Sequence, residues 1–392
     1  MVYKRVILKR GKEESLKRFH PWVFSGAIAR MDNIEEGDLV TVYDHEGNLI
    51  GNGHYQIGSI AVRILTFDDT EIDSAFFVKR LTEAFKMRQA LGLSRPDNNA
   101  FRLVHGEGDF LPGLVVDIYG STAVMQAHSP GMHFARNLIA DALTQLPNGV
   151  VKNVYYKSET TLPYKAQLDP QNEYIVGEYD TDVAMENGLK FHVDWLRGQK
   201  TGFFVDQREN RSLLEHYATG RKVLNMFCYT GGFSFYALRG GAELVHSVDS
   251  SAKAISLTDA NVELNFPNCE RHKSFAVDAF KYLDEMGSDY DLIVLDPPAF
   301  AKHKSALRNA LIGYRKLNAK AFEKIKPGGI LFTFSCSQAV NKEQFRLAVF
   351  SGAAMSRRKV RILHQLTQPA DHPINIYHPE GEYLKGLVLY VE

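Results

Sequence analysis

Residues 222–234 read KVLNMFCYTGGFS, and this stretch decides the fold of the carboxy-terminal half of the chain. The apolar run KVLNMF is followed by a glycine turn, Gly231-Gly232, which leads into an apolar segment with the spacing of a helix. Strand–turn–helix units of this kind bind ligands in open α/β folds. The turn lacks the G-x-G-x-x-G spacing that brings a backbone close to a pyrophosphate. We therefore expect a nucleoside-type cofactor without phosphates.

The alternation of strand and helix continues on both sides of this stretch, from about residue 189 to the end of the chain. Strands are expected at 222–227, 243–249, 271–277, 290–296, 329–335, 361–366 and 385–391. Helices are expected before and between them, at 210–218, 231–240, 252–265, 305–325 and 342–353. Runs such as IVLD and ILFTF are apolar throughout, as in strands that are buried on both faces. The pattern predicts an α/β domain with a mostly parallel, doubly wound, Rossmann-like sheet.

Acidic residues at the carboxyl ends of these strands are candidates for chemistry, because open α/β sheets bind ligands there. Asp249 ends the second strand, where a carboxylate can accept both hydroxyls of a ribose or can cap the next helix. Asp278 ends the third strand and is either a helix cap or, with the backbone of Ala279, a partner of an adenine amine. Asp296 ends the fourth strand before two prolines, which cannot continue a strand ladder. The prolines predict a stiff exit that leaves Asp296 facing the cleft.

Two smaller domains are expected before this α/β domain. Residues 1–72 contain short runs rich in Val, Ile and Tyr between glycine turns, which is typical of a small all-β barrel. Residues 75–93 have apolar positions three and four apart and are expected to form a linking helix. The segment that follows combines several strands with one helix at 132–146, which predicts a small α+β module on antiparallel strands. The predicted domains are 1–72, 73–188 and 189–392.

The composition is that of a globular protein, with 45% hydrophobic and 23% charged residues. Lys+Arg and Asp+Glu both number 46, so the chain has no overall basic bias that would draw it to nucleic acid. Residues 1–20 and 302–326 are locally basic, and these patches either bind phosphates or are solvated faces.

Cysteine usage and hydropathy exclude several classes of protein. The three cysteines, Cys228, Cys269 and Cys336, have no paired spacing, which excludes a disulfide framework and a Cys-rich zinc module. No metal site is predicted. No stretch is long and apolar enough for a membrane helix, and the amino terminus lacks the apolar core of a secretory signal. A reduced, cytoplasmic protein without membrane contacts is therefore expected.

Five motifs in register resemble those of a known family. TGFFVDQRENR, NMFCYTGGFS, VDSS, LDPPAF and FSCS occur in the order found in bacterial 23S rRNA 5-methylcytosine methyltransferases of the RlmI-like type. HPWVFSGAI and GNGHYQIGSIAVRIL look like the PUA barrel of these enzymes, and RLVHGEGDFLPGLVVDIYG looks like their central module. The resemblance covers essentially the whole chain. It implies S-adenosyl-L-methionine as the cofactor and RNA, specifically 23S rRNA, as the partner, and it leaves a homodimer open.

The resemblance also implies a role for individual residues. Those expected around the methionine part of the cofactor are Asn225, Phe227, Tyr229 and Gly231. Those expected at the ribose are Asp249 and Ser250, and those at the adenine edge are Asp278 and Ala279. The near wall of the cofactor site is expected to comprise Phe204, Gln207 and Arg208, with Asp296 also in contact. Substrate contacts are expected from Pro297, Pro298, Phe300 and Lys302.

Cys336 bears on which atom of the base is methylated. Carbon 5 of a pyrimidine is too weakly nucleophilic to attack a methyl sulfonium unaided, whereas addition of a thiolate to carbon 6 activates it. In RNA 5-methylcytosine enzymes generally, the nucleophile lies in a similar Thr/Ser-Cys-Ser segment, so the resemblance assigns this role to Cys336. Asp296 would then hydrogen-bond N3 of a flipped cytosine. The alternative for Cys336 is an inert buried thiol.

Other functions remain open at this point. Many enzymes of this kind carry a second cysteine where this chain has Ala299, so the base that removes the carbon-5 proton is not identified. A guanine (N7 or N2) rRNA methyltransferase would need the Asp-Pro-Pro segment but no nucleophilic cysteine, and Ser-Cys-Ser argues against it. An inactive RNA-binding or assembly protein is the third candidate. The presence of Asp249, Asp296 and Cys336 argues against that one.

Overall fold

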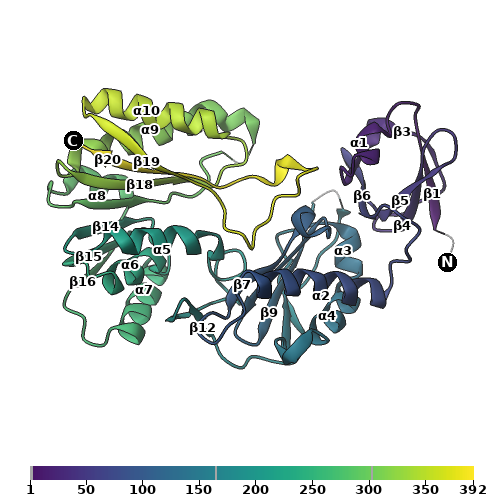
Figure 1. Ribbon diagram of the computed structural model, residues 1–392, viewed down its shortest axis with the longest axis horizontal. Helices are drawn as coiled ribbons and strands as arrows, with labels where there is room; N and C mark the ends of the chain where they lie inside the picture. The colour runs from purple at the N-terminus through teal and green to yellow at the C-terminus, as the bar shows by residue number, and fades with distance from the viewer. Residues whose placement is uncertain (1–2, 164–165, 302) are drawn as a thin grey trace. The chain divides into compact units, whose positions relative to one another are not determined.

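A computed structural model describes residues 3–163, 166–301 and 303–392 of the chain (Figure 1). The chain forms two compact units. The first comprises Met1–Gly188, Val193–Val205 and Ala370–Gly381, and the second comprises Leu189–His192, Asp206–Pro369 and Glu382–Glu392. Two short segments of the predicted 189–392 domain are thus grouped with the amino-terminal unit, and the three predicted domain ranges stay predictions.

The first unit begins with a six-stranded sheet in the order β2-β6-β5-β4-β1-β3. Its elements are β1 (Lys4–Leu8), α1 (Glu14–Lys17), β2 (Trp22–Phe24), η1 (Ser25–Ala27), β3 (Ile28–Met31), β4 (Leu39–Tyr43), β5 (Leu49–Tyr55) and β6 (Ile60–Thr66). β1 and β4 pair in parallel, and the other neighbours are antiparallel. A Cβ atom on Gly51 would lie 2.2 Å from the carbonyl oxygen of Thr66, so the close approach of β5 and β6 requires glycine there. Val6, Val40 and Val62 are in the core of this sheet.

The second part of the first unit packs helices on a five-stranded sheet in the order β11-β10-β9-β8-β7. Its elements are α2 (Ser74–Ala90), β7 (Ala100–His105), η2 (Gly106–Asp109), β8 (Leu114–Tyr119), β9 (Thr122–Ala127), α3 (Pro130–Phe134), α4 (Arg136–Thr144), η3 (Pro147–Gly149), β10 (Asn153–Tyr156) and β11 (Glu173–Val176), followed by β12 (Val183–Glu186). The predicted antiparallel sheet is wrong at one pair, because β9 and β10 run parallel. The single helix predicted at 132–146 is interrupted at Ala135.

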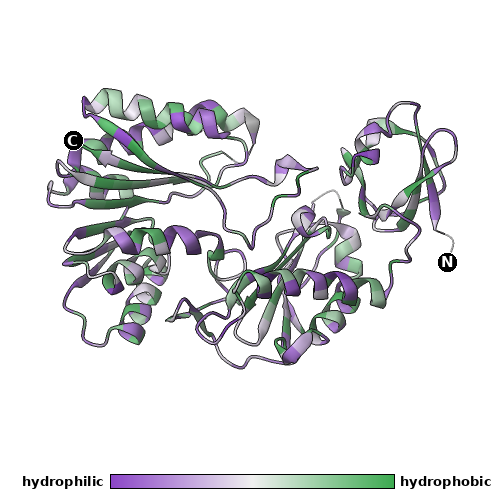
Figure 2. Cartoon of the chain, in the orientation of Figure 1, coloured by the Kyte–Doolittle hydropathy of each residue, from purple (hydrophilic) through white to green (hydrophobic). Residues whose placement is uncertain are grey.

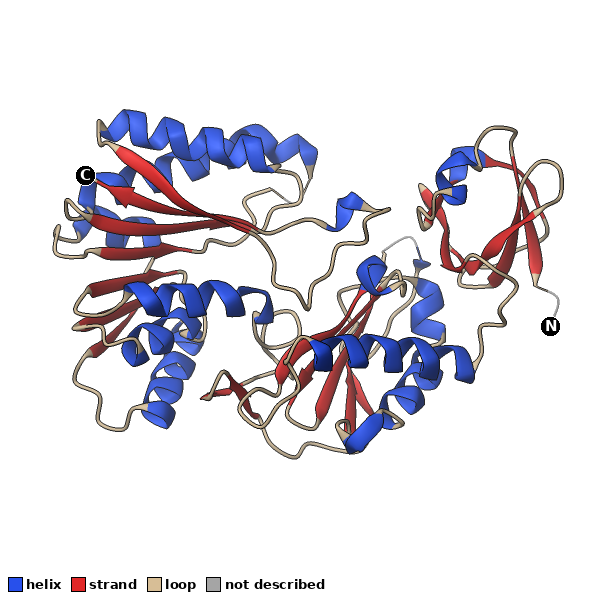
Figure 3. Ribbon diagram, in the orientation of Figure 1, coloured by secondary structure: helices blue, strands red, loops and turns tan. Residues whose placement is uncertain are grey.

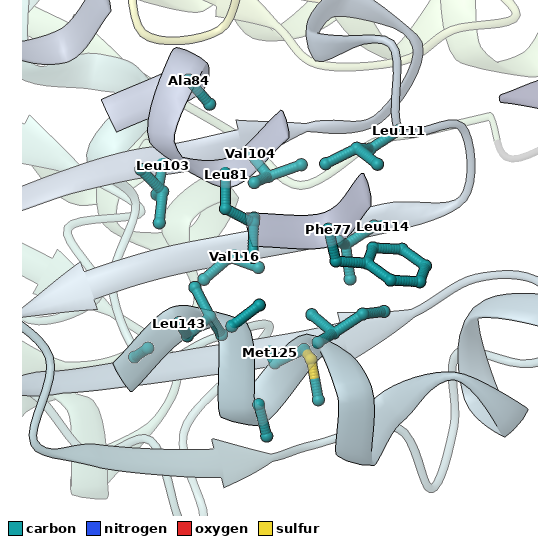
Figure 4. Close-up of a cluster of buried hydrophobic side chains, with 14 of the residues drawn as sticks. Phe77, Leu81, Ala84, Leu103, Val104, Leu111, Leu114, Val116, Met125 and Leu143 are labelled. Atoms are coloured by element: carbon teal, nitrogen blue, oxygen red, sulfur yellow. The ribbon is translucent and has the colours of Figure 1, made fainter. Parts of the chain in front are cut away.

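The helix predicted to link two domains, now α2, belongs to the core of this module. Phe77 and Leu81 on α2 are buried against Val104 and Val116 of the sheet, and Leu143 of α4 packs in the same cluster (Figure 4). The predicted helix is present and its apolar positions pack on the sheet of the module, and its role as a link between domains stays a prediction. Burying large apolar side chains contributes about 1.5–3 kcal/mol each, so α2 is a structural part of the module.

The second unit contains a seven-stranded sheet in the order β16-β15-β14-β17-β18-β20-β19. Its strands are β14 (Lys222–Met226), β15 (Leu244–Asp249), β16 (His272–Ala276), β17 (Leu292–Leu295), β18 (Gly329–Ser335), β19 (Val360–Leu366) and β20 (Lys385–Val391). β20 pairs antiparallel with both β18 and β19, and the other strand pairs are parallel. The predicted α/β fold with a doubly wound, mostly parallel sheet is confirmed.

Helices cover both faces of this sheet (Figure 3). They are α5 (Arg208–Tyr217), α6 (Gly232–Arg239), α7 (Ala252–Asn265), α8 (Ala279–Glu285), α9 (Leu307–Lys324) and α10 (Lys342–Ser356). The short elements β13 (Leu189–His192) and η6 (Lys304–Ala306) belong to this unit, η5 (Val205–Gln207) begins at the last residue of a first-unit segment, and η7 (Pro379–Gly381) belongs to the first unit. The central strands are hydrophobic along their length (Figure 2). In β17, Ile293 packs with α8, α9 and α10, whereas Leu292 packs with α5, α6 and α7. This arrangement fixes the carboxyl ends of the parallel strands at one edge.

No helix in the described part of the chain is both long enough and apolar enough to cross a bilayer.

Candidate active site

The loop after β14 has an unusual backbone. Phe227 and Tyr229 have φ values of 58° and 49°, in the left-handed region that side chains other than glycine rarely adopt, and Gly231 has a φ of 85°. Such conformations persist only where the surroundings enforce them, and they cluster at functional sites. All three residues belong to the set predicted around the cofactor.

Hydrogen bonds from neighbouring elements hold this loop in place. The backbone N–H of Cys228 donates to the carbonyl of Val248 at the end of β15, at 3.0 Å. The hydroxyl of Thr258 on α7 donates to the carbonyl of Tyr229 at 2.8 Å. A Cβ atom on Gly231 would lie 2.6 Å from a methyl group of Thr258, so the turn packs against α7 in a way that only glycine allows. The loop is therefore rigidly placed before any ligand binds.

Asp249 links this loop to the end of β15. Its carboxylate accepts the backbone N–H of Tyr229 at 3.0 Å and the backbone N–H of Ser251 at 2.9 Å. The alternative interpretation, in which Asp249 caps α7, is wrong, because the side chain of Ser251 caps that helix by accepting the N–H of Ala254. A carboxylate has about four acceptor positions, and only two are used by these backbone groups. The partly exposed Asp249 can still accept hydroxyls.

The end of β16 places a second carboxylate differently. Asp278 is exposed and caps α8, accepting the backbone N–H of Lys281 at 3.0 Å. The helix-cap interpretation of Asp278 is therefore correct. Ala279, the first residue of α8, is buried, and Ser250 is exposed beside Asp249. The adenine contact predicted for Asp278 and Ala279 stays a prediction.

Gln207 and Asp296 are brought together by the fold. The side-chain amide of Gln207, at the end of η5, donates to a carboxylate oxygen of Asp296 after β17 at 3.1 Å. Its own carbonyl accepts the amide of Asn210 at 2.6 Å, and Arg208 beside it is buried. Asn225 lies deeper, in β14, where its amide donates to the hydroxyl of Ser234 on α6 at 2.9 Å. One of the predicted near-wall residues, Gln207, thus stands next to a predicted catalytic carboxylate.

Other predicted residues have different environments. Phe204 belongs to the first unit, where the ammonium of Lys200 lies 4.6 Å from the centre of its ring, so its place at the cofactor stays a prediction. Pro297 is buried and Pro298 is exposed. Phe300 packs its ring 4.7 Å from that of Tyr314 on α9. Lys302, predicted to contact the substrate, lies outside the described residues.

Cys336 follows β18 between two anchored serines. The hydroxyl of Ser335 donates to the hydroxyl of Tyr314 at 2.9 Å, and the hydroxyl of Ser337 donates to the carbonyl of Ala301. Both serines are buried, whereas Cys336 is partly exposed. Burial raises the pKa of Tyr314 to about 12, and the negative charges of Cys336 and Asp296 contribute to the rise. The thiol and the carboxylate therefore lie near the same hydroxyl.

Lys385 is a member of this site that the sequence analysis missed. It begins β20 opposite Ser335, and its buried ammonium donates to the carbonyls of Ser337 at 2.5 Å and Tyr383 at 2.6 Å. Burial lowers the pKa of Lys385 to about 8, while the charge of Cys336 works in the opposite direction. The signal in the sequence was a single lysine at the start of the apolar run KGLVLYV.

The other two cysteines have structural surroundings. Cys228 is buried in the loop after β14, and burial, reinforced by the charge of Asp249, raises the pKa of its thiol far above the usual range. Its sulfur therefore stays protonated and is a poor nucleophile at neutral pH. Cys269 lies between α7 and β16 and packs against the hydrophobic core. Cys336 packs against the same core, but it follows the carboxyl end of β18, whereas Cys269 precedes β16.

Comparison with known proteins identifies the family. A family model for S-adenosylmethionine-dependent methyltransferases matches residues 105–376, and a PUA-like domain model matches residues 6–67. Ribosomal RNA large subunit methyltransferase I from Tolumonas auensis is 42% identical over 98% of both chains. The enzyme of that name from Escherichia coli (strain SMS-3-5 / SECEC) is 38% identical over 99% of both chains. The chain belongs to this methyltransferase family.

Solved structures agree with this assignment at the level of the fold. A SAM-dependent methyltransferase from Streptococcus mutans superimposes with a TM-score of 0.83 at 22% identity over the whole of both chains. A methyltransferase complexed with S-adenosylhomocysteine gives a TM-score of 0.84 at 23% identity, again over both whole chains. The expected resemblance of the amino-terminal sheet to a PUA domain is confirmed by the family model.

S-adenosylmethionine is the cofactor of this methyltransferase, and the residues at the strand ends fit it. Asp249 offers acceptor positions for ribose hydroxyls, and the loop from Phe227 to Gly231 presents a backbone held open by left-handed residues. The sequence of this loop lacks the glycine pattern that binds phosphates. This fits S-adenosylmethionine, because that cofactor is a nucleoside that carries a sulfonium group and no phosphates. When bound, the cofactor supplies an electrophilic methyl group.

Proposed function

We propose that this methyltransferase methylates carbon 5 of a cytosine in 23S rRNA through a covalent bond between Cys336 and the base. The observation that carries the proposal is the partly exposed Cys336 at the carboxyl end of β18, between Ser335, which pairs with Lys385 on β20, and Ser337, whose carbonyl accepts the ammonium of Lys385. Methylation of a guanine nitrogen requires no such thiol. The names of the relatives support ribosomal RNA as the substrate class.

The residues of the site carry out separate parts of the reaction. The thiolate of Cys336 forms a bond to carbon 6, and the electron pair of the carbon 5–carbon 6 double bond moves to carbon 5. The negative charge is delocalised through carbon 4 to N3, and carbon 5 becomes nucleophilic. Asp296, as the protonated acid, donates a hydrogen bond to N3 and transfers its proton there as the negative charge develops. After carbon 5 has been methylated, a general base takes its proton, the double bond forms again, and the bond from carbon 6 to Cys336 breaks to return the thiolate. N3 returns its proton to Asp296.

Lys385 supports this reaction through its charge. Its pKa of about 8 means that it is mostly an ammonium at pH 7, and a nearby cation favours the thiolate over the thiol. Its hydrogen bonds to two carbonyls hold the Ser335–Ser337 segment against β20. Lys385 is therefore a positioning residue for Cys336.

Replacing Lys385 with glutamine should slow the alkylation of Cys336 by iodoacetamide about tenfold at pH 7. Glutamine keeps an N–H donor for the carbonyls but removes the charge, so a smaller fraction of Cys336 is thiolate. The pH of half-maximal alkylation should move upward, and peptide mapping identifies the labelled cysteine. Lys4→Gln, which removes an exposed cation paired with Asp38, is the matched control and should behave as the wild type. Equal rates in all three proteins would remove Lys385 from this role.

Incubating the enzyme with methyl-labelled cofactor and bulk rRNA tests the proposed function directly. After digestion to nucleosides, the label should elute with 5-methylcytidine. Label in a methylguanosine would favour the guanine methyltransferase of the same architecture. Absence of label with a folded, cofactor-binding protein would favour an RNA-binding or assembly role. The PUA-like domain and the basic residues at 1–20 support RNA as the partner in each case.

A further inference from the structure

Two histidines and one glutamate form a cluster in the first unit that uses none of the residues proposed for methyl transfer. His20 lies between α1 and β2, whereas His378 and Glu380 lie in the segment 370–381 that follows β19. One potential ligand atom from each of these residues lies within 4.8 Å of the other two. Residues distant in the sequence thus converge on one point.

The carboxylate of Glu380 is shared between the two imidazole rings. One of its oxygens lies 3.7 Å from Nε2 of His20, and the other lies 3.7 Å from Nε2 of His378. These separations are too long for hydrogen bonds. Ligand atoms about 2.0–2.2 Å from a common tetrahedral ion lie about 3.3–3.5 Å apart, so a small contraction would let all three bind one ion.

The environment of His378 points to a ligand at this cluster. Its side chain is only 3% exposed, and among the described residues neither ring nitrogen has a hydrogen-bond partner. Buried polar groups are nearly always paired, because an unpaired one loses its hydration without compensation. A neutral imidazole has one ring nitrogen without a proton, and the lone pair of that nitrogen is available to a ligand. That is the form in which histidine binds metals.

Contacts other than those within the cluster fix the backbone around His20 and His378. Phe19 has a φ of 64°, which turns the chain sharply before His20. The side chain of Asn375 accepts the N–H of Tyr377 and donates to the carbonyl of Glu107, and the N–H of His378 donates to the carbonyl of Asn375. The ring of His378 also packs 4.3 Å from that of Trp22. Preorganised ligands of this kind lose little conformational entropy on binding.

We propose that His20, His378 and Glu380 bind one zinc ion. Two imidazole nitrogens and one carboxylate oxygen are a donor set typical of zinc, and the 50% exposed Glu380 leaves room for water in a fourth position. Glu107, whose carboxylate accepts the indole N–H of Trp22 at 2.9 Å, lies close enough to act electrostatically on His378 and adds a second negative charge. The sequence analysis predicted no metal site, so this proposal departs from it.

One local contact opposes zinc binding and must be released. Nδ1 of His20 accepts the backbone N–H of Trp22 at 3.3 Å, so the proton of a neutral ring is on Nε2. Zinc at Nε2 moves that proton to Nδ1, and the contact with Trp22 is lost. A long, part-buried hydrogen bond contributes far less than a coordinate bond from imidazole to zinc, so the balance favours the metal.

Zinc at this site would join the loop before β2 to the segment 370–381. The metal stabilises the folded state because the unfolded chain does not hold the three ligands together. The segment 370–381 is already anchored by buried contacts, since the carbonyl of Asp371 accepts the guanidinium of Arg88 at 2.7 Å. The zinc site therefore adds a second anchor nearer to β20.

Equilibrium dialysis of the metal-free full-length protein against zinc alone should find one ion bound per chain with micromolar or tighter affinity. Cobalt(II) in place of zinc should give the visible absorption of a four- or five-coordinate site with nitrogen and oxygen ligands. His378→Phe keeps an aromatic ring against Trp22 and should weaken zinc binding at least 100-fold. Glu380→Gln changes an exposed residue, so this variant should fold, and it should weaken zinc binding at least tenfold. It therefore tests the site even if His378→Phe does not fold.

The matched control is His45, a histidine of the same unit with two carboxylates nearby. Its ring nitrogens lie 3.7 Å from Glu13 and 3.6 Å from Glu46, but no second histidine of the described residues joins them in a candidate metal cluster. His45→Asn should bind zinc as the wild type does, and zinc should raise the melting temperature of both proteins but not that of His378→Phe. Failure of the wild type to bind zinc, or equal binding by Glu380→Gln, would overturn the proposal. Loss of binding in His45→Asn would place the ion elsewhere and would also overturn it.

Discussion

Replacing Cys336 with alanine should abolish methyl transfer and leave cofactor affinity nearly unchanged. The thiol acts on the base, and carbon 5 cannot be activated without a covalent partner at carbon 6. The rate of transfer to rRNA should fall at least 1000-fold, whereas titration with S-adenosylhomocysteine should give the wild-type affinity. The side chain is partly exposed at the end of β18, so removing its sulfur should not unfold the protein.

RNA that contains 5-fluorocytosine tests the same step by its product. Fluorine cannot leave as a proton does, so the bond from carbon 6 to Cys336 should persist after methylation. The wild type should give a protein–RNA adduct that survives denaturation, and Cys336→Ala should give none. Cys228→Ser is the control, because the thiol of Cys228 is buried and protonated, and this variant should still form the adduct. An adduct that maps to Cys228 or Cys269, or activity in Cys336→Ala, contradicts the assignment.

Much of the second unit could be predicted because its determinants are local. Apolar runs such as 292–295 identify strands, and the parallel arrangement then brings the strand ends to one edge, where Asp249, Asp296 and Cys336 follow their strands. The exact role of Asp249 could not be settled in this way. Aspartate and serine are both good helix caps, and only the structure shows that Ser251 caps α7.

The features that escaped prediction depend on contacts between distant parts of the chain. Lys385 stands beside Cys336 only because β20 pairs antiparallel with β18, and nothing in the residues around either one indicates that pairing. The segment 370–381 packs with the first unit although it lies between β19 and β20. The same applies to α2, whose spacing identifies a helix but not the sheet that it covers. Local patterns predict elements, whereas these partners are set by topology.

Replacing Asp249 with alanine should weaken binding of S-adenosylhomocysteine by one to two orders of magnitude. Each charge-assisted hydrogen bond from ribose contributes about 1.5–3 kcal/mol, and a tenfold loss of affinity corresponds to about 1.4 kcal/mol. The variant also leaves the N–H groups of Tyr229 and Ser251 without their acceptor, which loosens the loop after β14. Isothermal titration calorimetry measures the affinity.

Two further variants separate the contact with ribose from the support of the loop. Asp249→Asn keeps one oxygen that can accept the N–H of Tyr229 or Ser251, so this variant should retain the wild-type melting temperature. It loses the negative charge, so its affinity for S-adenosylhomocysteine should still be lower than that of the wild type. Asp259→Ala removes an exposed carboxylate on α7 that pairs with Ser274 and should change the affinity less than twofold. Wild-type affinity in Asp249→Ala would exclude this carboxylate from the cofactor site. Equal weakening by Asp259→Ala would instead show that the loss of negative charge, and not a contact at the end of β15, lowers the affinity.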